Sequence, residues 1–246
     1  MLDSFVADAR VVVIGASGGI GGAFVDALSA DPGVGRIDAC SRRPRASEAS
    51  KVRHHALDLD DDGSLDALDA ALAEGGPLDL VIVATGALHD GGDLVPEKSW
   101  RQVERAGLER AFALNTIGPA LVAKRLVPRL RRDHKAVFAA VSARVGSIGD
   151  NGLGGWYAYR ASKAALNQII RTFAIELARR APAAACIGLH PGTVATDLSA
   201  PFQASVPSGK LFTPAYAVDR LLGVIDGVGP ADTGRLLAWD GEVIPY

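Results

Sequence analysis

The stretch VVVIGASGGIGG, residues 11–22, decides the fold, because it joins an apolar run to a glycine-rich loop that opens a helical stretch. Glycines at positions 15, 19 and 21 let the backbone turn tightly and come close to a ligand. The first turn of the following helix presents free N–H groups and a partial positive charge, which suit a phosphate. A loop of this kind between a strand and a helix predicts a site for a dinucleotide.

Short apolar runs alternate with longer helical stretches along all 246 residues. We expect strands within 10–16, 36–42, 52–59, 78–86, 136–143, 185–192 and 234–241, and helices within 19–30, 62–74, 101–131, 156–180 and 214–228. This alternation is typical of a parallel sheet with crossover helices. The sequence therefore predicts one α/β domain over 1–246, a Rossmann-like, doubly wound parallel sheet of about seven strands with helices on both faces. Pro119 should kink or tighten the long helical stretch that contains it.

The composition limits the partners that this chain can have. A net charge of −2 with 22% charged residues gives no overall basic field, which argues against nucleic acid or an anionic membrane and for a small-molecule ligand. The start, MLDSFVADAR, resembles neither a signal peptide nor an anchor, so we expect a cytoplasmic protein. Cys40 and Cys186 lie in apolar runs and should be buried thiols, and the five histidines show no zinc-ligand spacing.

The stretch WYAYRASKAAL, residues 156–166, contains a candidate acid–base pair. Residues four apart share one face of a helix, so Tyr159 and Lys163 should lie together while Tyr157 points elsewhere. A nearby positive charge favours the phenolate and lowers the pKa of a tyrosine, which suits it to exchange a proton near neutrality. An ordinary exposed helix face is the alternative interpretation of this pair alone.

These motifs occur together with two others, Asn115 in the long helical stretch and PGTVAT at 191–196. In this order they resemble the short-chain dehydrogenase/reductase family over the whole chain. Within that family, ARVGSIGDNGLGGWYAYRASKAALN at 143–167 is especially similar to the C-factor or Sniffer-like carbonyl-reductase branch.

The resemblance implies roles for individual residues. Tyr159 would be the general acid and base, Lys163 would adjust its pKa and bind the nicotinamide ribose, and Asn115 would hold a water in the proton relay. The implied cofactor-binding residues are Gly15, Ser17, Gly19, Ile20, Gly21, Ser41, Arg42, Arg43, Asp58, Leu59, Ala84, Gly86, Tyr159, Lys163, Pro191, Gly192, Val194 and Thr196.

The end of the second expected strand predicts the choice of cofactor. Family members specific for NAD place an acidic residue there, whereas this chain has Ser41 followed by Arg42 and Arg43. Guanidinium groups suit the 2′-phosphate of NADP, so we expect NADP(H) to be preferred over NAD(H). A solvated basic turn, RRPR at 42–45, is the alternative.

The chain also departs from the family pattern. Ile14 and the stretch VATG at 83–86 replace a threonine and N-N-A-G, which removes side-chain hydrogen bonds between central strands. The position of the usual catalytic serine holds Ala143, with Ser142 before it and Ser147 shortly after. We favour Ser142 as the serine of the site, because a strand end is a more rigid platform than a glycine-flanked loop.

Together these features predict an enzyme that reduces a small aldehyde, ketone or quinone with NADPH, or oxidises the corresponding alcohol. A dinucleotide-binding signalling protein with little turnover is the alternative. The poorly periodic stretch 193–213 should form a mobile lid, and loops 87–100 and 144–156 should complete the substrate mouth. Small residues in the helix after 156 would allow two copies to pair closely as a homodimer or homotetramer.

Overall fold

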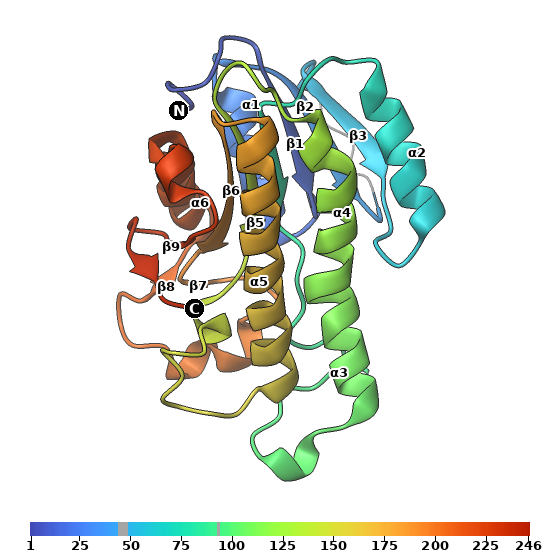
Figure 1. The fold of residues 1–246 in the computed structure, drawn as a ribbon. Coiled ribbons are helices and arrows are strands. Elements are labelled where there is room, and N and C mark those ends of the chain that lie inside the picture. Colours follow the sequence, from blue (N-terminus) through green and yellow to red (C-terminus); the bar gives the residue numbers. More distant parts are fainter. Residues whose placement is uncertain (44–48, 93) are drawn as a thin grey trace.

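The parallel sheet predicted from the sequence forms the centre of the structure. The computed structural model describes residues 1–43, 49–92 and 94–246 (Figure 1). Eight strands form one sheet in the order β10-β9-β6-β5-β4-β1-β2-β3, all parallel except β10, which is antiparallel to β9. The strands are β1 (Ala9–Ile14), β2 (Val34–Ser41), β3 (Val52–Ala56), β4 (Leu80–Val83), β5 (Ala136–Val141), β6 (Ala184–His190), β9 (Leu236–Ala238) and β10 (Val243–Ile244).

Helices cover both faces of this sheet, which confirms the predicted doubly wound arrangement (Figure 1). One face packs against α1 (Gly19–Ala30) and α6 (Pro214–Gly227). The other packs against α2 (Asp62–Ala73), α4 (Gly118–Leu126) and α5 (Tyr157–Arg180). Apolar side chains line both sides of the sheet, as expected for parallel strands that are buried on two faces. Cys40 in β2 and Cys186 in β6 are both buried, as predicted.

The long helix expected over 101–131 is instead a chain of shorter helices. A 3-10 turn at 100–102 precedes α3 (Arg105–Phe112), a π-helical turn spans Ala113–Ile117, and α4 ends in another 3-10 turn at 127–129. Pro119 lies at the start of α4 and has no N–H to donate to the preceding turn. The predicted irregularity therefore takes the form of a π turn just before the proline, with Asn115 at its centre.

The sequence analysis missed the two shortest pairings. Strand β10 extends the edge of the main sheet, and β7 (Thr193–Val194) pairs with β8 (Leu211–Phe212) in a separate two-stranded sheet. Strands of two residues carry no periodic pattern, so no sequence signal marks them. Through β7 and β8 the two ends of the 193–213 segment are tied together.

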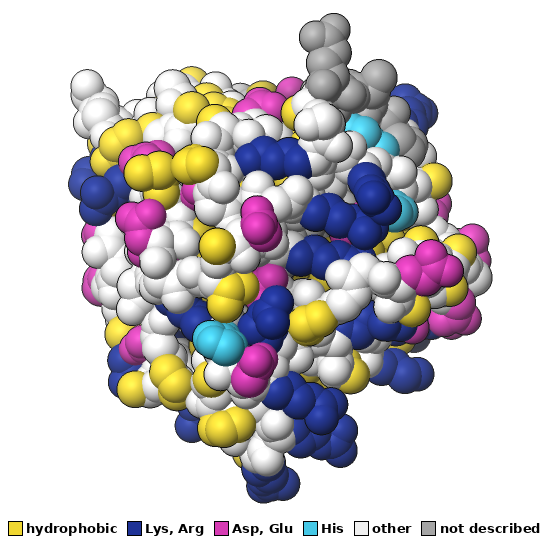
Figure 2. Space-filling model, turned by 90° about the horizontal axis from the view of Figure 1, so that it is seen from above, with side chains coloured by type: hydrophobic (Ala, Val, Ile, Leu, Met, Phe, Trp, Pro, Cys, Tyr) yellow, Lys and Arg dark blue, Asp and Glu magenta, His cyan; other side chains and the backbone are white. Residues whose placement is uncertain are grey.

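Charged side chains of both signs are interspersed at the end of the molecule where the parallel strands begin, which Figure 2 shows. Ion pairs join α4 and the turn after it to α2. Arg125 lies 2.6 Å from Asp66, and Arg129 lies 2.5 Å from Asp69. These pairs fix the two helices relative to one another, far from the carboxyl ends of the strands, where ligands bind in folds of this class.

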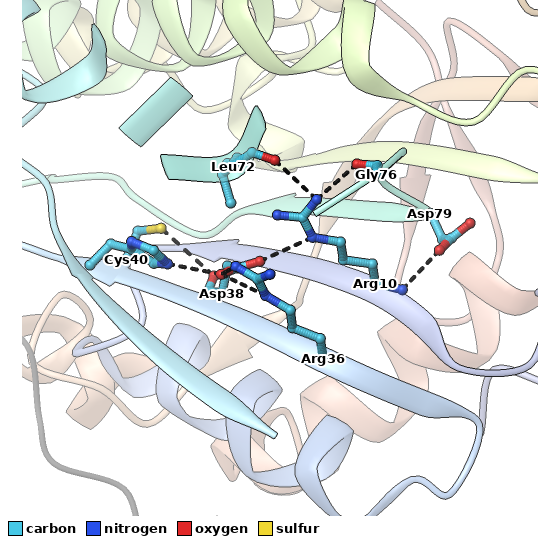
Figure 3. Close-up of polar contacts among 8 residues, drawn as sticks. Arg10, Arg36, Asp38, Cys40, Leu72, Gly76 and Asp79 are labelled. Carbon is cyan, nitrogen blue, oxygen red and sulfur yellow. Dashed lines mark hydrogen bonds and ion pairs between the residues drawn. The ribbon is translucent and has the colours of Figure 1, made fainter. Parts of the chain in front are cut away.

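A buried carboxylate joins the first three strands (Figure 3). Asp38 of β2 is fully buried and lies 3.3 Å from Nε of Arg10, 2.7 Å from Nη2 of Arg36 and 2.8 Å from Nε2 of His55. Arg10 also donates to the carbonyl oxygens of Leu72 and Gly76 at the end of α2. Burial opposes ionisation of Asp38, but hydrogen bonds from His55 and Arg36 outweigh it and lower its pKa.

We expect Asp38→Asn to lower the free energy of unfolding by roughly 3–5 kcal/mol at pH 7, because it leaves buried cations without their partner. Because the folded state lowers the pKa of Asp38, its stabilisation is present above the ordinary pKa and is lost as the pH falls through the lowered one. Urea unfolding measures both effects, with exposed Asp3→Asn as the control. An equal, small change in both variants would contradict the assigned role of Asp38.

Candidate active site

Close backbone contacts explain the three glycines of the loop between β1 and α1. Gly15 has a φ of +86°, and a Cβ there would lie 2.9 Å from Cγ2 of Thr85. A Cβ on Gly21 would lie 2.1 Å from the carbonyl oxygen of Gly15, and one on Gly19 would lie 2.6 Å from Cγ2 of Thr196. The glycines thus bring the helix start against the loop, β4 and the 193–213 segment, as the motif requires.

A cavity of about 550 Å³ lies at the carboxyl ends of β1, β2 and β4. Many of its described lining residues were predicted as cofactor-binding: Gly15, Ser17, Ser41, Arg42, Asp58, Leu59, Ala84 and Gly86. The sequence analysis missed others, among them Thr85, His89, Asp90, Arg110 and Leu114. Apart from Thr85, inside the quoted VATG stretch, these residues belong to no recognisable motif.

A second cavity of about 200 Å³ adjoins the first. Ala84, Thr85, Gly86 and Leu198 line both of them. The predicted residues that line the smaller cavity are Ile20, Ser142, Tyr159, Lys163, Pro191, Gly192, Val194 and Thr196. Among the predicted residues, Gly19, Gly21, Arg43 and Asn115 line neither cavity.

The turn after β2 contains both arginines predicted to recognise a 2′-phosphate. Ser41 is buried at the end of β2, and Arg42 and Arg43 are exposed. Of Arg42 and Arg43, only Arg42 lines the larger cavity. Pro44 and Arg45 of the RRPR turn lie outside the described residues. The two arginines therefore differ in position: Arg42 lies at the cavity that could hold a ligand, whereas Arg43 does not line it.

Tyr159 and Lys163 lie buried on one face of α5, as their spacing predicts. The Nζ atom of Lys163 lies 5.9 Å from the centre of the Tyr159 ring and donates to the carbonyl oxygen of Val141 at 2.8 Å. Both side chains line the smaller cavity. The alternative of an exposed helix face is therefore wrong.

Burial shifts the pKa of each member of this pair toward its neutral form. It raises the pKa of Tyr159 to about 12 and lowers that of Lys163 to about 7. The sequence analysis expected the charge of Lys163 to lower the pKa of Tyr159, but it did not include the burial of both groups. Lys163 consequently changes its charge near neutral pH.

Asn115 joins the π turn to the loop after β4 and to α5. Its side chain donates to the carbonyl oxygen of Ala87 at 2.9 Å and to Oγ of Ser162 at 3.1 Å, and it accepts from the Ala87 N–H at 2.8 Å. A Cβ on Gly86 would lie 3.3 Å from both Oδ1 of Asn115 and Nζ of Lys163. Asn115 therefore lies directly behind the smaller cavity although it does not line it.

The structure brings one of the two candidate serines to the site. Ser142 lines the smaller cavity, and its hydroxyl donates to Oδ1 of Asn167 at 2.7 Å. Ser147 is buried outside the cavity, where its hydroxyl accepts from the Asp150 N–H at 3.1 Å. Ala143, at the usual serine position, packs against Tyr159. A serine has one proton to donate, so Ser142 must release Asn167 before it can donate to a substrate.

The segment 193–213 covers both cavities. Between β7 and β8 it contains a 3-10 helix at 200–205. Leu198 lines both cavities and Phe202 lines the smaller one. Across the larger cavity, Nε2 of His89 lies 3.2 Å from the carbonyl oxygens of Asp197 and Leu198. The segment has the position expected of a lid, and its mobility stays a prediction.

Comparison with known proteins decides the family. The sequence profile described as short chain dehydrogenase matches residues 9–206. The chain belongs to this family. It is 37% identical over 144 residues to C-signal of Myxococcus xanthus, which covers 58% of this chain and 81% of that protein. It is 33% identical over 240 residues to 1-hydroxy-2-glutathionyl-2-methyl-3-butene dehydrogenase of Rhodococcus sp. (strain AD45), covering 96% and 99%.

Two solved structures show the same fold. The NADPH-bound carbonyl reductase from chicken fatty liver superposes with a TM-score of 0.84 at 24% identity, covering 99% of this chain and 97% of that one. Carbonyl reductase Sniffer of D. melanogaster superposes with a TM-score of 0.82 at 22% identity, covering 98% and 100%. The family match, together with these relatives, makes the chain an NAD(P)-dependent short-chain oxidoreductase, as the resemblance of its motifs predicted. No described helix is long and apolar enough to cross a membrane.

We expect Ser142→Ala to lower kcat by roughly 10-fold to 1000-fold, as for a removed donor to a developing oxyanion. Ser147→Ala, the matched control, should change kcat by less than about twofold, because its hydroxyl lies outside both cavities. Steady-state kinetics on the two variants measures this difference. A large loss in Ser147→Ala alone would show that the choice of Ser142 is wrong.

Proposed function

We propose that this oxidoreductase reduces a small aldehyde, ketone or quinone with NADPH, and that Tyr159 is its general acid. The observation that carries the proposal is the burial of Tyr159 and Lys163 together in the wall of the smaller cavity, which adjoins the larger one. A binding protein has no need of a phenol and an amine buried together in the wall of the smaller cavity. The same residues would serve the reverse oxidation of an alcohol.

The residues around the larger cavity suit a dinucleotide. Backbone approaches at Gly15 and Gly19 leave no room for side chains. Oγ1 of Thr85 is buried without a hydrogen-bond partner among the described residues, and Thr85 lines both cavities. A bound dinucleotide could supply that missing partner. Ser17 and Asp58 would contact its other polar groups.

When bound, the cofactor supplies the hydride that adds to the carbonyl carbon. The hydroxyl of Tyr159 transfers its proton to the carbonyl oxygen, which completes the alcohol. Protonated Lys163 stabilises the phenolate that remains on Tyr159. Asn115 fixes the π turn and Gly86 behind Lys163, and it would hold the water through which the proton is replaced. Ser142 would hydrogen-bond the carbonyl oxygen opposite Tyr159.

NADP(H) should be preferred because Arg42 lines the cavity beside Ser41, at the position where NAD-specific members have a carboxylate. We also infer a cytoplasmic enzyme that forms a homodimer or homotetramer. Ala161, Ala164 and Ala165 remain accessible on α5 for close packing, whereas Ala158 is buried within the chain.

A dinucleotide-binding signalling protein is the second candidate. Two observations favour it: the 37% identity to C-signal, and Ala143 in place of the usual serine. The hydroxyl of Ser142, which already donates to Asn167, also favours this second candidate. The buried pair Tyr159 and Lys163 remains the reason to prefer the enzyme.

We expect Arg42→Ala to weaken NADPH binding by a factor of roughly 10 to 150, the scale of one charge-assisted hydrogen bond, and to leave NADH binding unchanged. Arg43→Ala is the matched control, because Arg43 is also exposed but lies outside the cavity. Calorimetric titration of both cofactors into the three proteins tests the preference. Equal affinity of the wild type for NADH and NADPH would refute it.

We expect Tyr159→Phe to lower turnover by a factor of roughly 100 or more, because the proton donor is lost while the ring is kept. Cofactor affinity should change little. Tyr157→Phe removes an exposed hydroxyl two residues away and should leave both quantities unchanged. NADPH oxidation with a panel of aldehydes, ketones and quinones supplies the rates. Wild type that binds NADPH but oxidises it with none of these substrates would favour the signalling protein.

A further inference from the structure

The residue before α5 has a strained backbone. Trp156 has φ 51° and ψ 47°, a left-handed conformation, and it follows Gly154 and Gly155 at φ 66° and 67°. Glycine adopts this conformation freely, whereas a bulky side chain does so at a cost. Among the described residues other than glycine, only Asp8 shares a positive φ. At this position the sequence has a tryptophan, although glycine would adopt the same backbone conformation at a lower cost.

Buried contacts hold Trp156 in place. Its N–H donates to the carbonyl oxygen of Glu97 at 2.6 Å, and the Glu97 carboxylate accepts from the Ala158 N–H at 3.1 and 3.3 Å. Glu97 is itself buried, and its charge lies at the positive end of α5. From the other side, Arg160 donates to the carbonyl oxygens of Gly155 and Gly154. Several independent contacts therefore hold the strained turn in place. A strained backbone that is held in this way is typical of functional positions.

The strained backbone directs the indole to the wall of the smaller cavity. The Trp156 ring packs edge-on against Tyr159 at 6.4 Å and tilted against Phe202 of the lid at 5.0 Å. All three residues line the cavity, together with Leu88 and Val145.

The charges around this cavity are already engaged. Its described lining residues include no carboxylate, and Arg144 pairs with Glu242 at 2.6 Å and Asp150 at 3.3 Å. Lys163 donates to Val141, and burial lowers the pKa of His190 to about 4, so that this ring is neutral. A cationic tail on a substrate would find no carboxylate among these residues, and an anionic tail would find Arg144 already paired. The shape of the cavity and contacts with its aromatic rings can therefore distinguish one substrate from another.

We propose that Trp156 is the specificity-determining residue of this site, and that with Phe202 it selects a flat, unsaturated ring over a saturated ring of the same size. Glu97 is its positioning residue, because it holds the turn that directs the indole. The inference rests on the proposed carbonyl reduction for the identity of the reacting group. Aromatic faces stack on flat rings but pack poorly on puckered ones.

Kinetics on a matched pair of aldehydes tests the role of Trp156. The ratio of kcat/KM for benzaldehyde to that for cyclohexanecarbaldehyde should fall by a factor of roughly 2 to 12 in Trp156→Gly, the contribution of one aromatic contact. The intrinsic reactivities of the aldehydes cancel when proteins are compared. Glycine suits the observed φ, so the variant should fold, and Trp156→Asn tolerates the same backbone. Trp100→Ala, an exposed tryptophan outside both cavities, should leave the ratio unchanged.

Binding separates this proposal from the proposed reaction. Calorimetry with NADPH-saturated protein, in which an alcohol cannot be oxidised, should show tighter binding of benzyl alcohol than of cyclohexylmethanol in the wild type, and a loss of that preference in Trp156→Gly. If this preference is found but no aldehyde is reduced, the reductase function is wrong and the role of Trp156 is supported. If both aldehydes are reduced and the ratio is unchanged in Trp156→Gly, the role of Trp156 is overturned and the reductase stands. Equal binding of the two alcohols to the wild type also overturns the role of Trp156.

A conservative series tests Glu97. Glu97→Ala should lower the aldehyde ratio as Trp156→Gly does, whereas Glu97→Gln, which keeps an acceptor oxygen for the Ala158 N–H, should restore it. The double change Glu97→Ala and Trp156→Gly should lower the ratio no further than Trp156→Gly alone. An additive further loss in the double variant would show that Glu97 does not act through Trp156.

Discussion

The absence of a side chain at residue 86 lets three elements meet at the centre of this protein. Gly86 follows β4, and a Cβ there would come within 3.3 Å of both Asn115 in the π turn and Lys163 in α5. A methyl group at this point would require the ends of the Asn115 and Lys163 side chains to shift by a few tenths of an ångström. The hydrogen bonds of Asn115 to Ala87 and Ser162 then lock the three elements in register. This close approach places the side chains of Asn115 and Lys163 side by side against the loop after β4.

The same close packing has an electrostatic cost. Burial shifts the pKa of Tyr159 up and that of Lys163 down, so both groups are driven toward their neutral forms. A lysine whose pKa is about 7 is protonated below neutrality and neutral above it. Its folded-state pKa lies below the ordinary value, so keeping it buried costs stability once the pH falls below that ordinary value, and the cost levels off near pH 7. The burial that costs this stability also brings the pKa of Lys163 close to neutrality.

The sequence predicted the regular parts of the fold because they carry periodic patterns. The bounds of α1 agree with the expected 19–30, since the glycine loop and the following polar residues mark both ends. The acid–base pair was found because residues four apart on a helix must share a face. The stretch expected over 101–131 is helical from 105 to 126, but a π turn replaces the kink or tightened turn expected at Pro119, because no propensity marks its wider spacing. His89 and Trp156 lie in irregular loops, where only tertiary contacts decide which residues reach the cavities.

The buried ion cluster and the cavities occupy different parts of the sheet. The buried cluster around Asp38 draws on β1, β2, β3 and the end of α2, and its carboxylate is satisfied by three partners. At the carboxyl ends of the strands, buried polar groups lack partners. Oγ1 of Thr85 and Nδ1 of His190 have none among the described residues, and both residues line the cavities. Unsatisfied groups cost free energy in the protein alone, and a ligand that pairs with them recovers it. Nη2 of Arg10 and Nε2 of His54 also lack partners among the described residues, but only Thr85 and His190 line cavities where a ligand could supply one.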